Sequence, residues 1–151
     1  EALRLKRDVY SGSLRFFGEE APDTLREANN YAAALHLLKR FEEAKSLLRR
    51  TLPVARRVLG ESHQITLGMK SNYAAVLYAD PDAMLDDVRE AVTLLEETDR
   101  TARRVLGGVH PLTSFIERDL RRARDRLAAR DGGVSAIRDA VEAMTSTTTI
   151  G

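Results

Sequence analysis

Apolar residues recur at three- and four-residue spacing along most of the chain, which is the pattern of amphipathic helices. Between 82 and 105 one helical face carries Met84, Leu85, Val88, Ala91, Val92 and Leu95. This spacing, together with the positions of glycine and proline, predicts an all-α fold with helices near 1–16, 22–37, 40–58, 63–79, 82–105, 111–130 and 134–145. The last residues, 146–151, show no helical pattern and are expected to form a flexible tail.

Blocks of the sequence also recur at a regular distance. The block FFGEEAPDTL begins at Phe16, VLGESHQITL begins 42 residues later at Val58, and VLGGVHPLTS begins 47 residues after that at Val105. Each block has an apolar pair, a glycine and a short polar turn, which is typical of the end of one helix and the start of the next. We expect these glycines to adopt the left-handed conformation, which glycine reaches at no steric cost.

The helices between these turns repeat as well, since NNYAAAL from Asn29 matches SNYAAVL from Ser71. Five extra residues between Leu77 and Glu90 are expected to form an irregularity that projects from the stack. We divide the chain into one repeat domain, 1–145, whose parts are the second helix of a preceding repeat (1–18), a full repeat (19–60), a repeat with the five-residue insertion (61–107) and a degenerate C-terminal repeat (108–145).

These motifs resemble tetratricopeptide repeats of the 42-residue kinesin light chain type, over about residues 1 to 115. Lys39 stands where such repeats usually have a turn glycine, and Ala21 stands where they have a histidine. The resemblance implies a right-handed solenoid of antiparallel helix hairpins. Because one hairpin cannot bury its apolar face alone, stacked hairpins form a continuous core and a curved array.

The resemblance further implies that the first helix of each hairpin lines a concave surface that receives a segment of a partner protein. Asparagine both donates and accepts hydrogen bonds, so Asn29 and Asn72 could hold the backbone of a bound peptide. An equally weighted alternative is that the asparagines tie adjacent hairpins together. Arg118 and Arg122 would favour acidic side chains. The candidate partner-binding residues are Arg26, Asn29, Asn30, His36, Ser71, Asn72, Arg118 and Arg122.

The predicted function is that of a protein-protein interaction module, an adaptor or scaffold that binds a peptide segment or a partner domain, which could be acidic. The alternative is a structural subunit packed permanently within a larger assembly. The segment 1–16 favours this alternative, because its residues Leu3, Leu5, Val9 and Leu14 need cover from an upstream repeat or a neighbouring chain. Either way, we expect the chain to be part of a longer protein or a larger complex.

Composition narrows the other classes of function. The 151 residues include 24 Lys plus Arg and 23 Asp plus Glu, so the net charge is close to zero. Nucleic-acid-binding proteins usually carry a basic excess, and we therefore do not expect a nucleic-acid partner. With no cysteine and three dispersed histidines, no metal site or cofactor is predicted. No nucleophile and base pair or phosphate loop is recognisable, so we predict that the chain is not an enzyme. No apolar stretch is long enough to span a membrane, and a cytoplasmic location is expected.

Three single residues carry structural predictions. His63 and His110 occupy the same turn position of the repeat, so they are expected to cap or pack against helix starts. Pro53 falls inside a predicted helix, where it removes one backbone hydrogen bond, and a kink is expected there.

Overall fold

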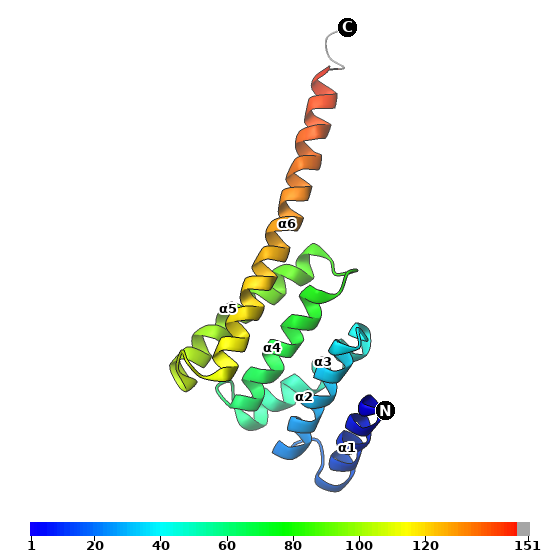
Figure 1. Ribbon diagram of the computed structural model, residues 1–151, viewed down its shortest axis with the longest axis vertical. Helices are drawn as coiled ribbons and strands as arrows, with labels where there is room; N and C mark the ends of the chain where they lie inside the picture. The colour runs from blue at the N-terminus through cyan, green and yellow to red at the C-terminus, as the bar shows by residue number, and fades with distance from the viewer. Residues whose placement is uncertain (148–151) are drawn as a thin grey trace.

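The computed structural model describes residues 1–147, which form helices joined by short turns (Figure 1). This part of the chain contains no strand, so the predicted all-α fold class is confirmed. The helices are α1 (Ala2–Phe17), α2 (Pro22–Leu37), α3 (Phe41–Leu59), α4 (Gln64–Ala79), α5 (Leu85–Leu106) and α6 (Pro111–Thr147).

The helices are arranged in two layers. Each helix packs against the next one along the chain, and α4 also contacts both α2 and α6 directly. The helices α1, α3 and α5 make no such direct contacts with one another. The first helices of the repeats, α2, α4 and α6, therefore form one layer, and α1, α3 and α5 form the other (Figure 1).

Two clusters of buried side chains form one connected core. Leu25, Leu35 and Leu48 belong to the first cluster, and the second is centred on residues of α4, α5 and the start of α6. Tyr73 packs against both clusters and so joins them. Alanines lie at the closest approaches of the helices, because a small side chain lets two backbones come near each other; Ala28, Ala32, Ala44, Ala55 and Ala74 are fully buried.

The turn glycines have the positive φ that the sequence predicted. Gly18, Gly60 and Gly107 have φ of 84°, 90° and 86°. Their ψ values of 170°, 164° and 160° place them in an extended region open essentially to glycine alone, not in the left-handed helical region that we expected. The chain therefore leaves these helices in an extended direction. Lys39 does adopt the left-handed conformation, with φ of 59°, at the position of the missing turn glycine.

The prediction for the two turn histidines is confirmed. His63 Nδ1 accepts a hydrogen bond from the backbone N–H of Ile65 at 3.1 Å, and His110 Nδ1 accepts one from Leu112 at 3.0 Å. Each imidazole thus satisfies one of the N–H groups that have no partner within the first turn of a helix. Ala21, at the same position before α2, provides no such cap.

Pro53 lies within α3, which the structure shows as a single helix. The proline ring is exposed, and it has no N–H to donate to the carbonyl of Arg49. The kink that the sequence predicted at this point stays a prediction.

The inserted segment corrects two predictions. Helix α5 begins at Leu85 and not near 82, because the Asp80 carboxylate accepts a hydrogen bond from the Asp82 N–H at 2.9 Å and folds this segment into a turn. The insertion does not project as a whole, since Asp80 and Ala83 are buried. A guanidinium N–H of Arg126 on α6 donates to the Asp80 carbonyl at 3.2 Å and holds the turn against the stack.

Helix α6 is a single helix of 37 residues, so the prediction of two helices, 111–130 and 134–145, is wrong. Gly132 and Gly133 lie inside it in helical conformation, because glycine weakens a helix without obliging the chain to turn. The outer half of α6 projects away from the stack (Figure 1), and its side chains from 131 to 146 are exposed. Residues 146 and 147 are helical and not part of a tail; residues 148–151 lie outside the described residues. The boundaries of the repeats stay predictions.

Replacing both Gly132 and Gly133 by Ala should strengthen the outer half of α6. Alanine is favoured over glycine inside a helix by about 0.5–1 kcal/mol per residue. An added Cβ at either position meets nothing within 4 Å. Far-ultraviolet circular dichroism should report more helix, and amide hydrogen exchange should slow over residues 128–147. A loss of helix on this double substitution would favour the hairpin that the sequence predicted.

Candidate functional site

The predicted partner-binding residues all lie on the three helices of one layer. Arg26, Asn29, Asn30 and His36 are on α2, Ser71 and Asn72 are on α4, and Arg118 and Arg122 are on α6. Direct contacts of α4 with α2 and with α6 bring the three helices side by side. The layer formed by α2, α4 and α6 is called the inner layer below.

Two asparagines join the first pair of helices in the inner layer. Asn72 Nδ2 donates to Asn29 Oδ1 at 2.7 Å, so the two side chains tie α4 to α2. Gly68 makes room for this contact, since a Cβ there would lie 3.2 Å from Asn29 Nδ2. The alternative that the asparagines hold adjacent hairpins together is therefore supported. Asn29 Nδ2 makes no hydrogen bond within the described part of the chain and remains able to donate to a ligand.

The same link recurs between α4 and α6 with different residues. Ser71 Oγ donates to Asp119 Oδ2 at 3.1 Å. In the repeat alignment Ser71 is the counterpart of Asn29, and Asp119 is the counterpart of Asn72. The contacts Asn29–Asn72 and Ser71–Asp119 are thus successive rungs of one hydrogen-bond ladder across the inner layer.

The structure corrects the role predicted for Ser71. Its side chain is 1% exposed and bonded to Asp119, so a partner could not reach it without repacking of the inner layer. Sequence reasoning overlooked Asp119 as a buried partner of this serine. The repeat makes Asp119 the counterpart of Asn72, 47 residues later, but this spacing does not say which residue of the neighbouring helix it contacts.

Asp119 places a buried carboxylate in the inner layer. It is 3% exposed, and its Oδ1 accepts a hydrogen bond from the Tyr78 hydroxyl at 3.1 Å. Burial raises the pKa of Asp119, while hydrogen bonds from Tyr78 and Ser71 and the charges of nearby arginines partly oppose the rise. Burial, and next the charge of Asp119, raise the pKa of Tyr78. The tyrosine therefore remains a hydrogen-bond donor to the carboxylate throughout the neutral range.

His36 is half-buried and lies in the last turn of α2. Burial lowers its pKa, and the negative charge of Asp119 opposes this effect only in part. The imidazole ring packs near Phe41 of α3, with ring centroids 5.9 Å apart. At neutral pH His36 is thus a neutral side chain that can donate and accept hydrogen bonds.

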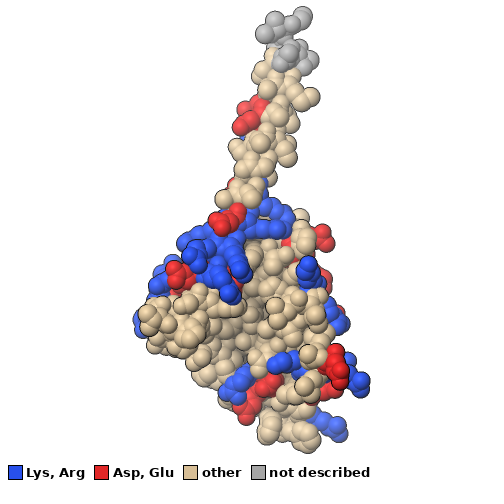
Figure 2. All heavy atoms as spheres, viewed as in Figure 1, with Lys and Arg blue, Asp and Glu red and all other residues tan. Residues whose placement is uncertain are grey.

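Arginines dominate the surface of α6 where it leaves the stack, and Figure 2 shows this basic region. Several of them already have partners among the described residues. Arg124 pairs with Glu96 of α5 at 3.2 Å, and Arg126 binds the turn before α5. Arg118 lies over the ring of Phe115, with its guanidinium carbon 4.4 Å from the ring centroid. Arg118 and Arg122 are exposed, as Arg121 is, so all three could contact a ligand.

A hollow of about 420 Å³ lies where the first turns of α2, α4 and α6 meet. The absence of a side chain at Gly68 deepens it, and Asn29 and Arg26 border it from α2. Its remaining lining residues are His63, Gln64, Ile65 and Leu112. Asn30, the residue after Asn29, is half-buried and is not among the residues that line the hollow. Ile65 and Leu112 give the hollow an apolar part, and the polar side chains around them offer hydrogen-bonding groups, a combination that can orient a ligand.

Neither a metal cluster nor a membrane-spanning helix is found among the described residues. No group of three or more histidines and carboxylates within 1–147 is placed to hold a metal ion. None of the helices in this range is both long and apolar enough to cross a membrane.

Comparison with known proteins agrees with this architecture. Residues 24–65 match the tetratricopeptide repeat family. A crystal structure of a proposed kinesin light chain from Podosopora anserina, with nearly identical TPR-like repeats, superposes with a TM-score of 0.62; it is 23% identical, and the match covers 100% of this chain and 69% of that one. A single-substitution variant of the same protein gives a TM-score of 0.65 at 23% identity, covering 100% and 68%. No curated protein matches the sequence.

The chain therefore contains a tetratricopeptide repeat, and its helices stack in the manner of kinesin light chain-like TPR arrays. The predicted tetratricopeptide repeat is confirmed over residues 24–65, and the predicted all-α helical repeat fold is confirmed. Tetratricopeptide repeats are in general protein-protein interaction modules and typically act as non-enzymatic scaffolds. A long apolar membrane helix is not part of the described chain.

Replacing Asp119 by Ala should lower the free energy of unfolding by about 2–3 kcal/mol, because the buried hydroxyls of Ser71 and Tyr78 would lose their acceptor. Asp119→Asn should cost less, since the amide oxygen still accepts from one hydroxyl, the other hydroxyl can accept from the amide nitrogen, and the buried charge is removed. Urea unfolding at neutral pH measures both. Equal stability of the Ala variant and the wild type would show that these hydroxyls are satisfied without Asp119.

Proposed function

We propose that this chain is a protein-interaction module that binds a segment of a partner protein on the inner layer of α2, α4 and α6. The observation that carries the proposal is the hollow at the first turns of these helices, where the apolar side chains of Ile65 and Leu112 lie near the unused amide of Asn29. A partner side chain enters the hollow, and its backbone carbonyl accepts from Asn29 Nδ2.

The charges around the hollow favour an acidic segment. Arg26 borders the hollow and is exposed; its only partner among the described residues is Asp23, at 2.7 Å on the same exposed face. Surface pairs of this kind contribute little, so the guanidinium exchanges readily for a ligand carboxylate. On α6, Arg118 lies over the ring of Phe115 and supplies a second exposed cation on the inner layer. Arg122 lies close enough to Asp119 and Tyr78 to affect their pKa values. Because it already interacts with these two residues, it contributes less than Arg26 and Arg118 to binding the ligand.

A second candidate, a subunit packed permanently in an assembly, is favoured by the outer face of α1. Leu5 is 64% exposed, Val9 42% and Phe16 79%. The equivalent helices in the next two hairpins are α3 and α5. Helix α2 packs against α3, and α4 packs against α5, as the first helix of the same hairpin. A neighbouring helix that covered α1 in the same way would make the chain one part of a longer stack.

Charge reversal at the hollow tests the first candidate. Peptides selected from a displayed library against the whole chain are measured by calorimetry with the wild type and with Arg26→Glu. We expect the selected peptides to be acidic and to bind the variant about tenfold or more weakly. Arg4→Glu, on the exposed surface of α1, is the matched control and should leave affinity unchanged.

The same peptides distinguish the second candidate. If binding is lost in Leu5→Asp and persists in Arg26→Glu, the partner covers α1 and the inner layer is not the binding site. Asn29 and Asn72 are unsuitable for this test, because their substitution would also loosen α2 from α4.

A further inference from the structure

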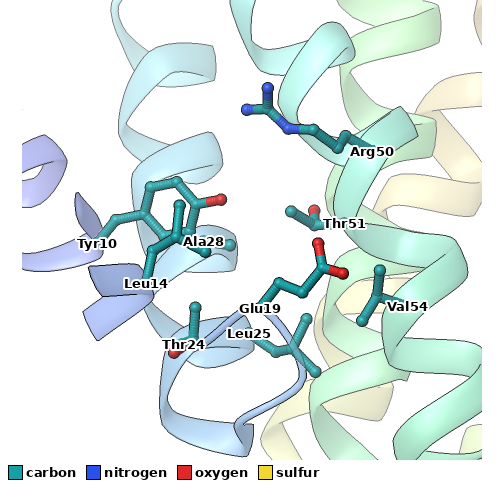
Figure 3. A pocket seen from close by; sticks show the side chains of 9 residues that line it. All are labelled: Tyr10, Leu14, Glu19, Thr24, Leu25, Ala28, Arg50, Thr51 and Val54. Carbon is teal, nitrogen blue, oxygen red and sulfur yellow. The ribbon is translucent and has the colours of Figure 1, made fainter. Parts of the chain in front are cut away.

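A second cavity lies on the other side of the stack, in the furrow between α1 and α3 above α2 (Figure 3). It measures about 190 Å³, which is the scale of a cavity that can hold one apolar group. Tyr10, Leu14, Leu25 and Val54 give it mainly apolar walls. This cavity is the α1–α3 slot.

The repeat shows what occupies the same place one hairpin later, in the furrow between α3 and α5 above α4. There Glu61 is the counterpart of Glu19, and Lys70 is the counterpart of Ala28. Glu19 and Ala28 line the first furrow, and Glu61 and Lys70 line the later furrow at the equivalent positions.

Lys70 lies along the later furrow with its side chain buried, although a shallow hollow of about 490 Å³ remains beside it. The side chain is 7% exposed, and its ammonium forms an ion pair with the Glu61 carboxylate. The hydrogen bond from Lys70 lowers the pKa of Glu61, which shows that the contact favours the charged carboxylate. A lysine stem lying along apolar walls, with the ammonium on a carboxylate at the rim, is therefore an arrangement that this chain already contains.

The first furrow has the carboxylate without the lysine. Ala28 is fully buried, and its methyl group leaves the slot open. Glu19 makes no ion pair within the described part of the chain, and Figure 3 shows its side chain directed into the slot. We propose that the α1–α3 slot binds a lysine side chain presented by a partner protein, with the alkyl stem between the apolar walls and the ammonium on Glu19.

Arg50 sets a further condition on the partner. It stands at the rim where the later furrow has Glu97, so it adds a positive charge near the incoming lysine. An acidic residue beside the partner lysine would pair with Arg50 and offset this repulsion. The slot thus favours a lysine with an acidic neighbour. It faces away from the inner layer, so this contact does not depend on the proposed function.

The n-butylammonium ion, which has the length and charge of a lysine side chain, is the probe for the slot. Titration of the isotope-labelled chain at neutral pH should shift the NMR signals of Ala28, Thr51 and Val54. Glu19→Gln should weaken binding about two- to fivefold, the usual range for an exposed ion pair. Butan-1-ol, of the same length without the charge, should bind more weakly by a similar factor. Equal binding of the alcohol and the ammonium ion, or shifts confined to other parts of the chain, would overturn the proposal.

Exchanging the two repeat positions gives matched controls. Ala28→Lys should place a lysine in the slot from within the chain, abolish the probe shifts at Thr51 and Val54, and leave the melting temperature unchanged or raised. Lys70→Ala should open an equivalent site and add probe shifts around Thr66 and Thr98. If Ala28→Lys unfolds the chain or still binds the probe as the wild type does, the slot does not accept a lysine and the inference fails. Arg26→Glu should leave probe binding unchanged.

Discussion

The close packing of α2, α4 and α6 is the constraint on which the rest of the structure depends. Hairpins can stack in many ways that bury apolar residues, but the ladder of Asn29–Asn72 and Ser71–Asp119 fixes how far each first helix is shifted along the next. Buried polar groups that must find partners specify one arrangement in a way that apolar contacts do not. The inner layer, its hollow and the furrows on the opposite side all follow from this one arrangement.

Differences between equivalent positions turn a regular stack into one with distinct sites. Gly68 stands where the other hairpins have Arg26 and Phe115, and it opens the hollow of the inner layer. Ala28 stands where the next hairpin has Lys70, and it opens the α1–α3 slot. Each of the two sites thus lies where one hairpin has a small residue and the equivalent position of a neighbouring hairpin has a large side chain.

The repeat spacing predicted most of the helices and the histidine caps because these depend on short-range patterns that recur, while the layer of first helices was expected from the resemblance to tetratricopeptide repeats. The hydrogen-bond partners of Ser71 and Asn72 could not be assigned, since the ladder depends on the shift between hairpins and not on residue type. The continuity of α6 through Gly132 and Gly133 was missed for a related reason. Glycine permits a turn, but a turn forms only where packing of the following helix stabilises it, and the outer half of α6 has no such packing against the stack.

The free energy of coupling between Asn29 and Asn72 tests this account most directly. Unfolding free energies of the wild type, Asn29→Ala, Asn72→Ala and the double variant form a double-mutant cycle. If the ladder holds the inner layer together, the two asparagines should couple by about 0.5–1.5 kcal/mol, the net contribution of one hydrogen bond. Strictly additive effects of the two substitutions would show that α2 and α4 are held by apolar packing alone, and would contradict the central role of the ladder.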